Sequence, residues 1–365
     1  MMERGKISGL QMAILLYPTI IATAILLVPA ISGKFAEQDM WLSPIWASLA
    51  GFLTVYIALL LHNHYPELTI MQYSGKIIGF IPGKIVGLGL LFYLLHTNGV
   101  VLREYGEFVV GNFLPSTPII VITGSMAFVC ALSVRGGLEV MARSAQIFIP
   151  VFMTLFLVII LLLFPELRPA NIFPVMDDGI TPSIKGAIVP SQWFTEFFLI
   201  IFMLPYLRTK EKRMTWGMLS VVAVMITLVI TNLFSLLLFG DITSKFTYPV
   251  MSAARYIDVA DFLQHVESIV MAIWVVGVFI KVSVFYYAIV IGTAQWLHLS
   301  DYRPIVFPIG LLLIIFSTWV AASLQELSHF LSTVWPFYAL VFQLVLPVLL
   351  LLVAMMRKKA AENDN

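Results

Sequence analysis

Long hydrophobic runs alternate with short polar connections along the whole chain. The runs are about 20 residues long, which is the length that an α-helix needs to cross a membrane. The connections hold most of the glycine, proline and charged residues. The pattern predicts ten transmembrane helices, near residues 10–28, 41–61, 81–102, 117–134, 144–164, 186–206, 215–239, 266–294, 304–323 and 333–356.

Composition supports the same class of protein. Hydrophobic residues make up 60% of the 365 positions and charged residues 11%, whereas soluble proteins carry roughly 25% charged residues. We therefore expect an all-α polytopic membrane protein in which residues 1–365 form one integral domain in the lipid bilayer. The net charge of +1 gives no indication of a nucleic-acid partner.

Motifs for chemistry are missing from the sequence. The single cysteine, Cys130, lies inside an apolar run, so neither a disulfide framework nor a thiolate metal site is expected. No phosphate-binding loop, dinucleotide fingerprint, HExxH motif or hydrolase elbow occurs. We predict no cofactor, no metal and no enzymatic activity.

Basic residues predict the orientation of the helices, because cytoplasmic loops carry an excess of lysine and arginine. With the N-terminus inside, 14 of the 21 basic residues fall in cytoplasmic segments, 6 in external segments, and Lys281 remains. Both termini are then cytoplasmic, and residues 357–365 form a cytoplasmic tail. The run 10–28 is interpreted as the first span, since no small-residue cleavage site precedes Pro29.

Lys281 lies midway along the predicted eighth span, in the sequence VFIKVSVFYY. Placing a cation at the centre of a bilayer costs at least ~2.5–3.5 kcal/mol. Its side chain is also too far from either end of the helix to reach the interface. Lys281 must therefore face protein or water.

Two predicted spans share a pattern that suggests an inverted repeat. In both, a proline that removes a helical hydrogen bond is followed by hydroxyl residues at +1 and +5. These residues are Pro18, Thr19 and Thr23 in the first span and Pro190, Ser191 and Thr195 in the sixth. Five spans separate them, so the two segments cross in opposite senses, as in transporters with a midplane site. We expect two five-helix halves, residues 1–165 and 186–356.

Glu196 is the one acidic residue in the predicted sixth span, and a buried carboxylate requires protonation or a cation. Three interpretations of Glu196 and Lys281 stay open: a structural bridge, a site where Lys281 meets the carboxylate of a zwitterion, and a proton relay. In the third span, Thr97 and Asn98 are expected to line a cavity. Arg103 and Glu107 are spaced to pair on one helix face.

Several segments resemble the endospore germination permeases, the B subunits of nutrient germinant receptors within the amino acid/polyamine/organocation (APC) superfamily. The matching segments are EQDMWLSPIWASLAG (37–51), LREYGEFVVGNFLPSTP (102–118), VRGGLEVMARSAQIFIP (134–150), NIFPVMDDGI (171–180), FTYPVMSAARYIDVADFLQHVESIVMAIWVVGVFIKVSVF (246–285) and LSDYRPIVFPIGLLL (299–313).

The resemblance implies a LeuT/APC-like fold of ten helices in a 5+5 inverted repeat. It also implies a sensor for an amino acid, or for a sugar or nucleoside, in the spore inner membrane, with receptor A and C subunits as partners. The pocket of the family falls near Thr97 and Lys281. Related permeases often have glycines at the break in the first span, and PTIIATAI has none.

We therefore predict the B subunit of a germinant receptor that binds a small nutrient in a mid-membrane pocket. The alternative is a proton-coupled secondary amino acid transporter. The candidate ligand-binding residues are Pro18, Thr19, Thr23, Thr97, Asn98, Ser191, Gln192, Thr195, Glu196 and Lys281.

Overall fold

The computed structural model describes residues 3, 5–209, 211–257 and 266–363, and nearly all of them are helical. These residues form no β-strand, and a single parallel bridge pairs Ile7 with Leu207. The predicted all-α class is confirmed. The predicted tail, 357–365, lies partly outside the described residues.

Fifteen α-helices lie within the described residues. In the first half of the chain they are α1 (Gly9–Ala36), α2 (Ser43–His64), α3 (Ile70–Ile78), α4 (Phe80–Asn112), α5 (Ile119–Gly136) and α6 (Leu138–Leu163). In the second half they are α7 (Thr181–Ile188), α8 (Ser191–Thr195), α9 (Arg213–Phe239), α10 (Pro249–Arg255), α11 (Glu267–Trp296), α12 (Val306–Trp319), α13 (Leu324–Thr333), α14 (Trp335–Leu340) and α15 (Leu346–Asn363).

Length and hydropathy identify seven stretches in the described residues that can cross a membrane, or eight if the bent pair α12 and α13 counts as one span. These criteria do not confirm the predicted count of ten. One stretch, Gly9–His64, contains both α1 and α2, which a 3₁₀ segment at Glu37–Leu42 separates. The apolar helix Ser191–Phe202 is too short to be counted. The chain is an integral membrane protein.

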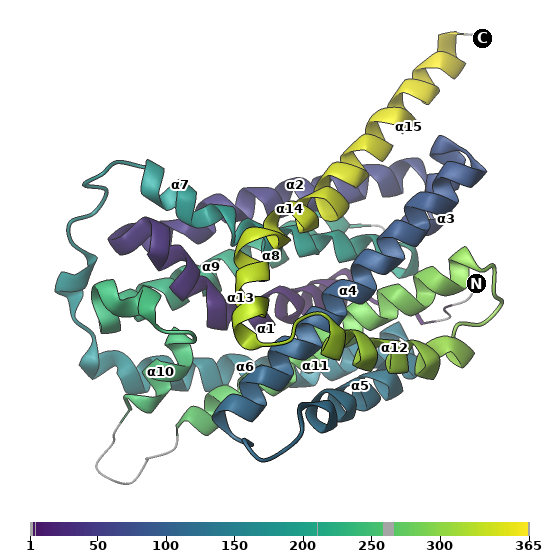
Figure 1. The fold of residues 1–365 in the computed structure, drawn as a ribbon. Coiled ribbons are helices and arrows are strands. Elements are labelled where there is room, and N and C mark those ends of the chain that lie inside the picture. Colours follow the sequence, from purple (N-terminus) through teal and green to yellow (C-terminus); the bar gives the residue numbers. More distant parts are fainter. Residues whose placement is uncertain (1–2, 4, 210, 258–265, 364–365) are drawn as a thin grey trace.

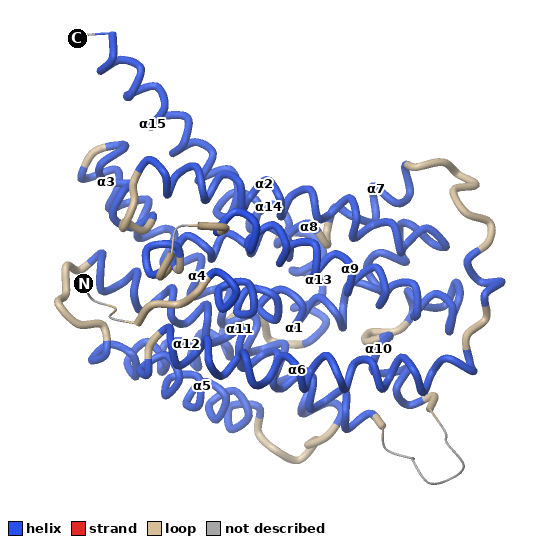
Figure 2. The backbone as a smooth tube through the Cα atoms, turned by 180° about the vertical axis from the view of Figure 1, so that it is seen from behind, coloured by secondary structure: helices blue, strands red, loops and turns tan. Residues whose placement is uncertain are grey.

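Helix α1 lies in the middle of the bundle and packs against α6, α7, α9 and α11 (Figures 1 and 2). Most of its side chains are buried. In contrast, α6 exposes a row of large hydrophobic side chains, at Ile147, Val151, Leu157 and Leu161. Such a surface is stable against lipid and not against water, so α6 belongs to the lipid-facing shell and α1 to the core.

The predicted break in the first span is wrong. Helix α1 continues through Pro18, and the Thr19 hydroxyl donates to the carbonyl of Leu15 over 2.7 Å. The stretch after Pro18 has no glycine, so side-chain packing on every face holds the backbone helical. Proline can be accommodated in a membrane helix when neighbours and hydroxyl groups satisfy the backbone locally.

The sixth predicted span is interrupted. Helix α7 ends at Ile188, Pro190 precedes the five-residue α8, and the chain continues as a 3₁₀ helix over Glu196–Phe202. A 3₁₀ helix has poorer hydrogen-bond geometry than an α-helix and often marks a hinge or a functional site. Glu196 is the first residue of this segment.

Candidate functional site

A buried ion pair lies at the centre of the bundle. The Nζ atom of Lys281, on α11, is 2.9 Å from Oε1 and 2.7 Å from Oε2 of Glu196. It also donates to Oγ1 of Thr23, on α1, over 2.9 Å. These three acceptors match the three protons of an ammonium group. The contact between Lys281 and Glu196, which the sequence left open, is present.

Thr23 connects this pair to a fourth residue. The indole nitrogen of Trp193, on α8, donates to Oγ1 of Thr23 over 2.9 Å. Thr23 therefore accepts two hydrogen bonds, and no acceptor within the described residues takes its own hydroxyl proton. We call Thr23, Trp193, Glu196 and Lys281 the junction, because they join α1, α8 with its 3₁₀ extension, and α11.

A glycine allows the helices to approach at the junction. A Cβ atom on Gly277 of α11 would lie 3.1 Å from Cβ and 3.4 Å from Cα of Ala22 on α1. Gly277 is one helical turn before Lys281, and Ala22 precedes Thr23. The close packing of α1 and α11 thus places the lysine within hydrogen-bond distance of Thr23.

Burial makes the junction energetically demanding. Lys281 is 0% exposed and Glu196 3% exposed. Transfer of two charges out of water costs several kcal/mol per ion, and only close geometry with further hydrogen bonds offsets that cost. The bidentate contact with Glu196 provides the close geometry, and the bond to Thr23 provides a further hydrogen bond. Each charge is therefore stable in the core only while the other is present.

The other predicted site residues make mainly local contacts. Thr97 donates to the carbonyl of Tyr93 over 2.8 Å, and Ser191 donates to that of Ile188 over 2.6 Å. Pro18 and Thr19 lie within the continuous α1. Of the predicted residues, the structure brings Thr23, Glu196 and Lys281 together, and it leaves these four outside the junction.

Two predicted residues, Asn98 and Thr195, link helices in other places, and a third, Gln192, does not. Asn98 donates to the carbonyl of Val282 on α11 over 3.3 Å. Thr195 lies 2.5 Å from Oε1 of Gln343, in a π-helical segment between α14 and α15. Gln192 is buried, and neither atom of its amide group has a partner among the described residues.

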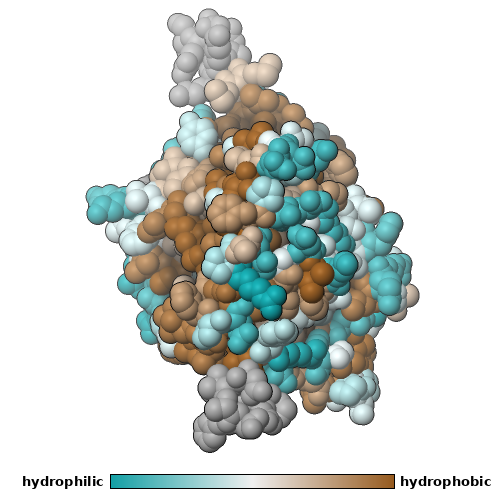
Figure 3. Space-filling model, turned by 90° about the vertical axis from the view of Figure 1, so that its left-hand side faces the viewer, coloured by the Kyte–Doolittle hydropathy of each residue, from teal (hydrophilic) through white to brown (hydrophobic). Residues whose placement is uncertain are grey.

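A cavity of about 200 Å³ extends along the C-terminal half of α1, from Thr23 to Lys34. Side chains of α4, α11, α13 and the segment before α10 complete its wall. Lys34 and Lys245 are exposed on the lining, whereas Thr23 is buried. The cavity therefore runs from the protein surface to the junction. Hydrophilic residues gather on the face of the molecule where α7 and α10 lie (Figures 1 and 3).

Glu104 and Trp274 also line this cavity, and neither was predicted from the sequence. The Oε1 atom of Glu104 and the Nε1 atom of Trp274 are buried and have no hydrogen-bond partner within the described part of the chain. One feature of the sequence could have pointed to Glu104. Arg103 pairs with Glu107 at 2.7 Å, as predicted, so Arg103 is not the partner of Glu104, which lies between them in the sequence.

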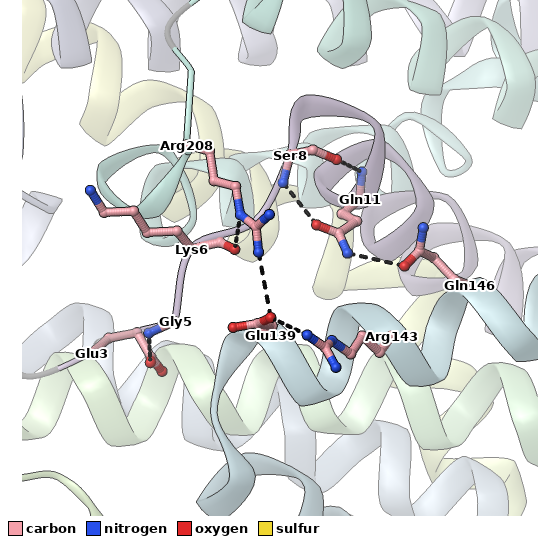
Figure 4. A network of polar contacts seen from close by, with 9 residues as sticks. All are labelled: Glu3, Gly5, Lys6, Ser8, Gln11, Glu139, Arg143, Gln146 and Arg208. Carbon is pink, nitrogen blue, oxygen red and sulfur yellow. Dashed lines mark hydrogen bonds and ion pairs between the residues drawn. The ribbon is translucent and has the colours of Figure 1, made fainter.

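A polar network closes the opposite, N-terminal end of α1 (Figure 4). Arg208 donates from Nε to the carbonyl of Lys6 over 2.9 Å and from Nη2 to Glu139 over 3.4 Å. Glu139 also accepts from Arg143 over 2.5 Å. The segment before α1 is thereby tied to the start of α6 and to the end of the interrupted span.

Glu3 is the buried member of this N-terminal network. Its Oε1 atom accepts from the backbone of Gly5 over 2.7 Å, and Oε2 accepts from the backbone of Leu138 over 3.2 Å and from the Tyr302 hydroxyl over 3.1 Å. Burial, and then the adjacent carboxylate of Glu3, raise the pKa of Tyr302 above its usual value, so the phenol stays protonated and donates.

Comparison with known proteins shows the family. Residues 6–325 match a family described as spore germination protein. The chain belongs to this family. Spore germination protein KB of Bacillus subtilis (strain 168) is 25% identical over 370 aligned residues, which cover 100% of this chain and 98% of that protein. Spore germination protein XB of Bacillus anthracis is 25% identical over 272 residues, covering 74% and 76% of the two chains.

A solved structure shows the fold of this family member. A Na⁺-coupled sialic acid symporter, solved in a substrate-bound outward-open state, superimposes with a TM-score of 0.64 at 9% sequence identity. The match covers 93% of this chain and 80% of the symporter chain. The predicted LeuT/APC-like fold is confirmed.

Proposed function

We propose that this spore germination protein is the B subunit of a germinant receptor, and that it binds a small nutrient, in the first place an amino acid, in the cavity above the junction. Family membership and a transporter fold support this proposal. The observation that carries it is the position of Thr23, which lines the cavity and accepts a hydrogen bond from Lys281.

The junction provides a route from binding to response. A ligand can shift a conformational equilibrium only by its difference in affinity for the two states. A ligand that bonds to Thr23 competes with or strengthens the contacts that hold α1 to α8 and α11. Binding in the cavity then changes the relative stability of two arrangements of these helices, and contacts with the A and C subunits transmit the change.

The proposal includes the setting of the protein. We place it in the spore inner membrane with both termini in the cytoplasm and with two inverted halves, 1–165 and 186–356. Excess basic residues in the assigned cytoplasmic segments support this orientation. The cavity then opens on the side of the membrane away from the cytoplasm, and a nutrient reaches it from that side.

The test is a germination screen of spores whose one functional receptor contains this chain, across amino acids, sugars and nucleosides. We expect a response to at least one amino acid, and Thr23→Val to raise the concentration that gives half-maximal germination while the protein still accumulates. A Thr23→Val receptor that responds at the wild-type concentration would contradict a binding role for this cavity.

A proton-coupled amino acid transporter is the second candidate, which the symporter fold favours. Uptake by the purified protein in proteoliposomes separates the two functions. Accumulation of an amino acid that is driven by a proton gradient would support transport, whereas specific binding without accumulation supports a sensor.

A further inference from the structure

Lys281 and Glu104 differ in what they can offer a ligand. Each of the three protons of the Lys281 ammonium has an acceptor within the junction, on Thr23 or Glu196. Glu104 lines the cavity and is 8% exposed, and its Oε1 atom has no partner among the described residues. A buried acceptor without a donor costs free energy, which a ligand that supplies the donor regains.

The surroundings of Glu104 specify the chemistry of that donor. Glu104 is the acidic residue on a wall that is otherwise formed by apolar, hydroxyl, aromatic and lysine side chains. A carboxylate at low dielectric pairs most strongly with a cation that also donates hydrogen bonds. An ammonium group has this chemistry, whereas a sugar or a carboxylate ligand would leave the charge unpaired.

The same cavity carries groups that suit the acceptor end of a ligand. The indole N–H of Trp274 has no acceptor in the described part of the chain, and its ring is held against Phe108 with ring centroids 4.1 Å apart. Thr23 has a hydroxyl proton that no described acceptor takes. Lys34 and Lys245 are exposed on the lining. A ligand that carries a carboxylate beside its ammonium group can accept a hydrogen bond from any of these side chains.

We propose that Glu104 binds the ammonium group of the ligand, with Trp274 as a donor to its carboxylate, so that the protein selects small zwitterionic amino acids through Glu104 rather than through Lys281. This assignment rests on the proposed function, since it concerns the same cavity. The volume of about 200 Å³ is below the roughly 300–1,000 Å³ of sites for drug-sized ligands, and it fits a ligand of few heavy atoms.

The test is a binding assay on the full chain in lipid nanodiscs. The probes are the 20 common L-amino acids and, for the tightest binder, its decarboxylated amine and its deaminated acid. We expect the deaminated acid to bind about tenfold or more weakly than the amino acid, because a charged hydrogen bond is lost. Glu104→Gln weakens the amino acid and the amine by a similar factor and leaves the acid unchanged.

Glu107→Gln is the matched control, because Glu107 lies one turn further along α4 and pairs with Arg103 outside the cavity. It should leave all three affinities unchanged. If Glu104→Gln does not yield folded protein, Trp274→Phe serves in its place, and it should weaken the amino acid more than the amine. Equal binding of the amino acid and the deaminated acid, or no binding by any amino acid, would overturn the proposal.

Germination assays separate this inference from the proposed function. Glu104-dependent binding of an amino acid that triggers no germination would contradict the receptor function and leave the inference intact. Germination by a sugar, at the same concentration in wild-type and Glu104→Gln spores, would contradict the inference and leave the receptor function intact.

Discussion

Glu3, beside the N-terminal end of α1, and Glu104, in the cavity along the C-terminal half of α1, are two buried glutamates that differ in their partners. They are similarly buried, at 5% and 8% exposure. Glu3 accepts hydrogen bonds on both carboxylate oxygens, from the backbone of Gly5 and Leu138 and from Tyr302. Glu104 has an oxygen that accepts from no donor among the described residues, and it lines a cavity.

The difference separates a structural charge from one that is available to a ligand. Full satisfaction of Glu3 fixes the segment before α1, which closes that end of the bundle. The free oxygen of Glu104 is stabilised only when a donor enters the cavity. Glu196 is a third case, since its cation is supplied by Lys281 of the same chain. The carboxylates of Glu3, Glu104 and Glu196 thus have three different roles.

Removal of Lys281 should have the largest effect. Lys281→Met leaves Glu196 buried without a cation, and breaking such a pair on one side costs about 3–5 kcal/mol. We expect this loss in the free energy of unfolding, measured by titration with SDS in mixed micelles. The double variant Lys281→Met, Glu196→Gln removes both charges and should recover part of the loss.

A double variant as unstable as Lys281→Met alone would show that the charge of Glu196 is not what the lysine stabilises. In that case the lysine acts through Thr23, and Thr23→Val should reproduce the loss. The comparison of the three carboxylates would then reduce to Glu3 and Glu104.

The second prediction compares the two glutamates directly. Glu3→Gln replaces one acceptor oxygen with an N–H₂ group and removes the charge that strengthens the remaining hydrogen bonds. We expect the free energy of unfolding to fall by about 1.5–3 kcal/mol. Glu104→Gln, measured without ligand, should leave the free energy of unfolding unchanged or raise it, because no charged hydrogen bond within the described protein is lost. Equal destabilisation by the two substitutions would contradict the distinction between them.

The sequence predicted the helical class and the fold better than the shape of the site, and it left the partner of Lys281 open. Hydrophobic runs and a lone mid-span cation are local features, so they predict that Lys281 is buried and faces protein or water, but they do not identify the residue it contacts. Helix α1 was predicted to break at Pro18 because proline removes a hydrogen bond, but dense packing around a glycine-free segment preserves the helix. Glu104 and Trp274 were missed because their cavity depends on α1, α4, α11, α13 and the segment before α10 together.

The smallest effect is expected on the surface of the N-terminal network. Arg143 and Arg208 share Glu139, and both arginines are exposed, where an ion pair contributes about 0.2–1 kcal/mol. Arg143→Ala should cost an amount in this range and less at 1 M salt, because salt screens exposed charges. Arg208→Ala should cost more and depend less on salt, since Arg208 also donates to the carbonyl of Lys6. Equal costs with equal salt dependence would show that the bond from Arg208 to the carbonyl of Lys6 contributes nothing.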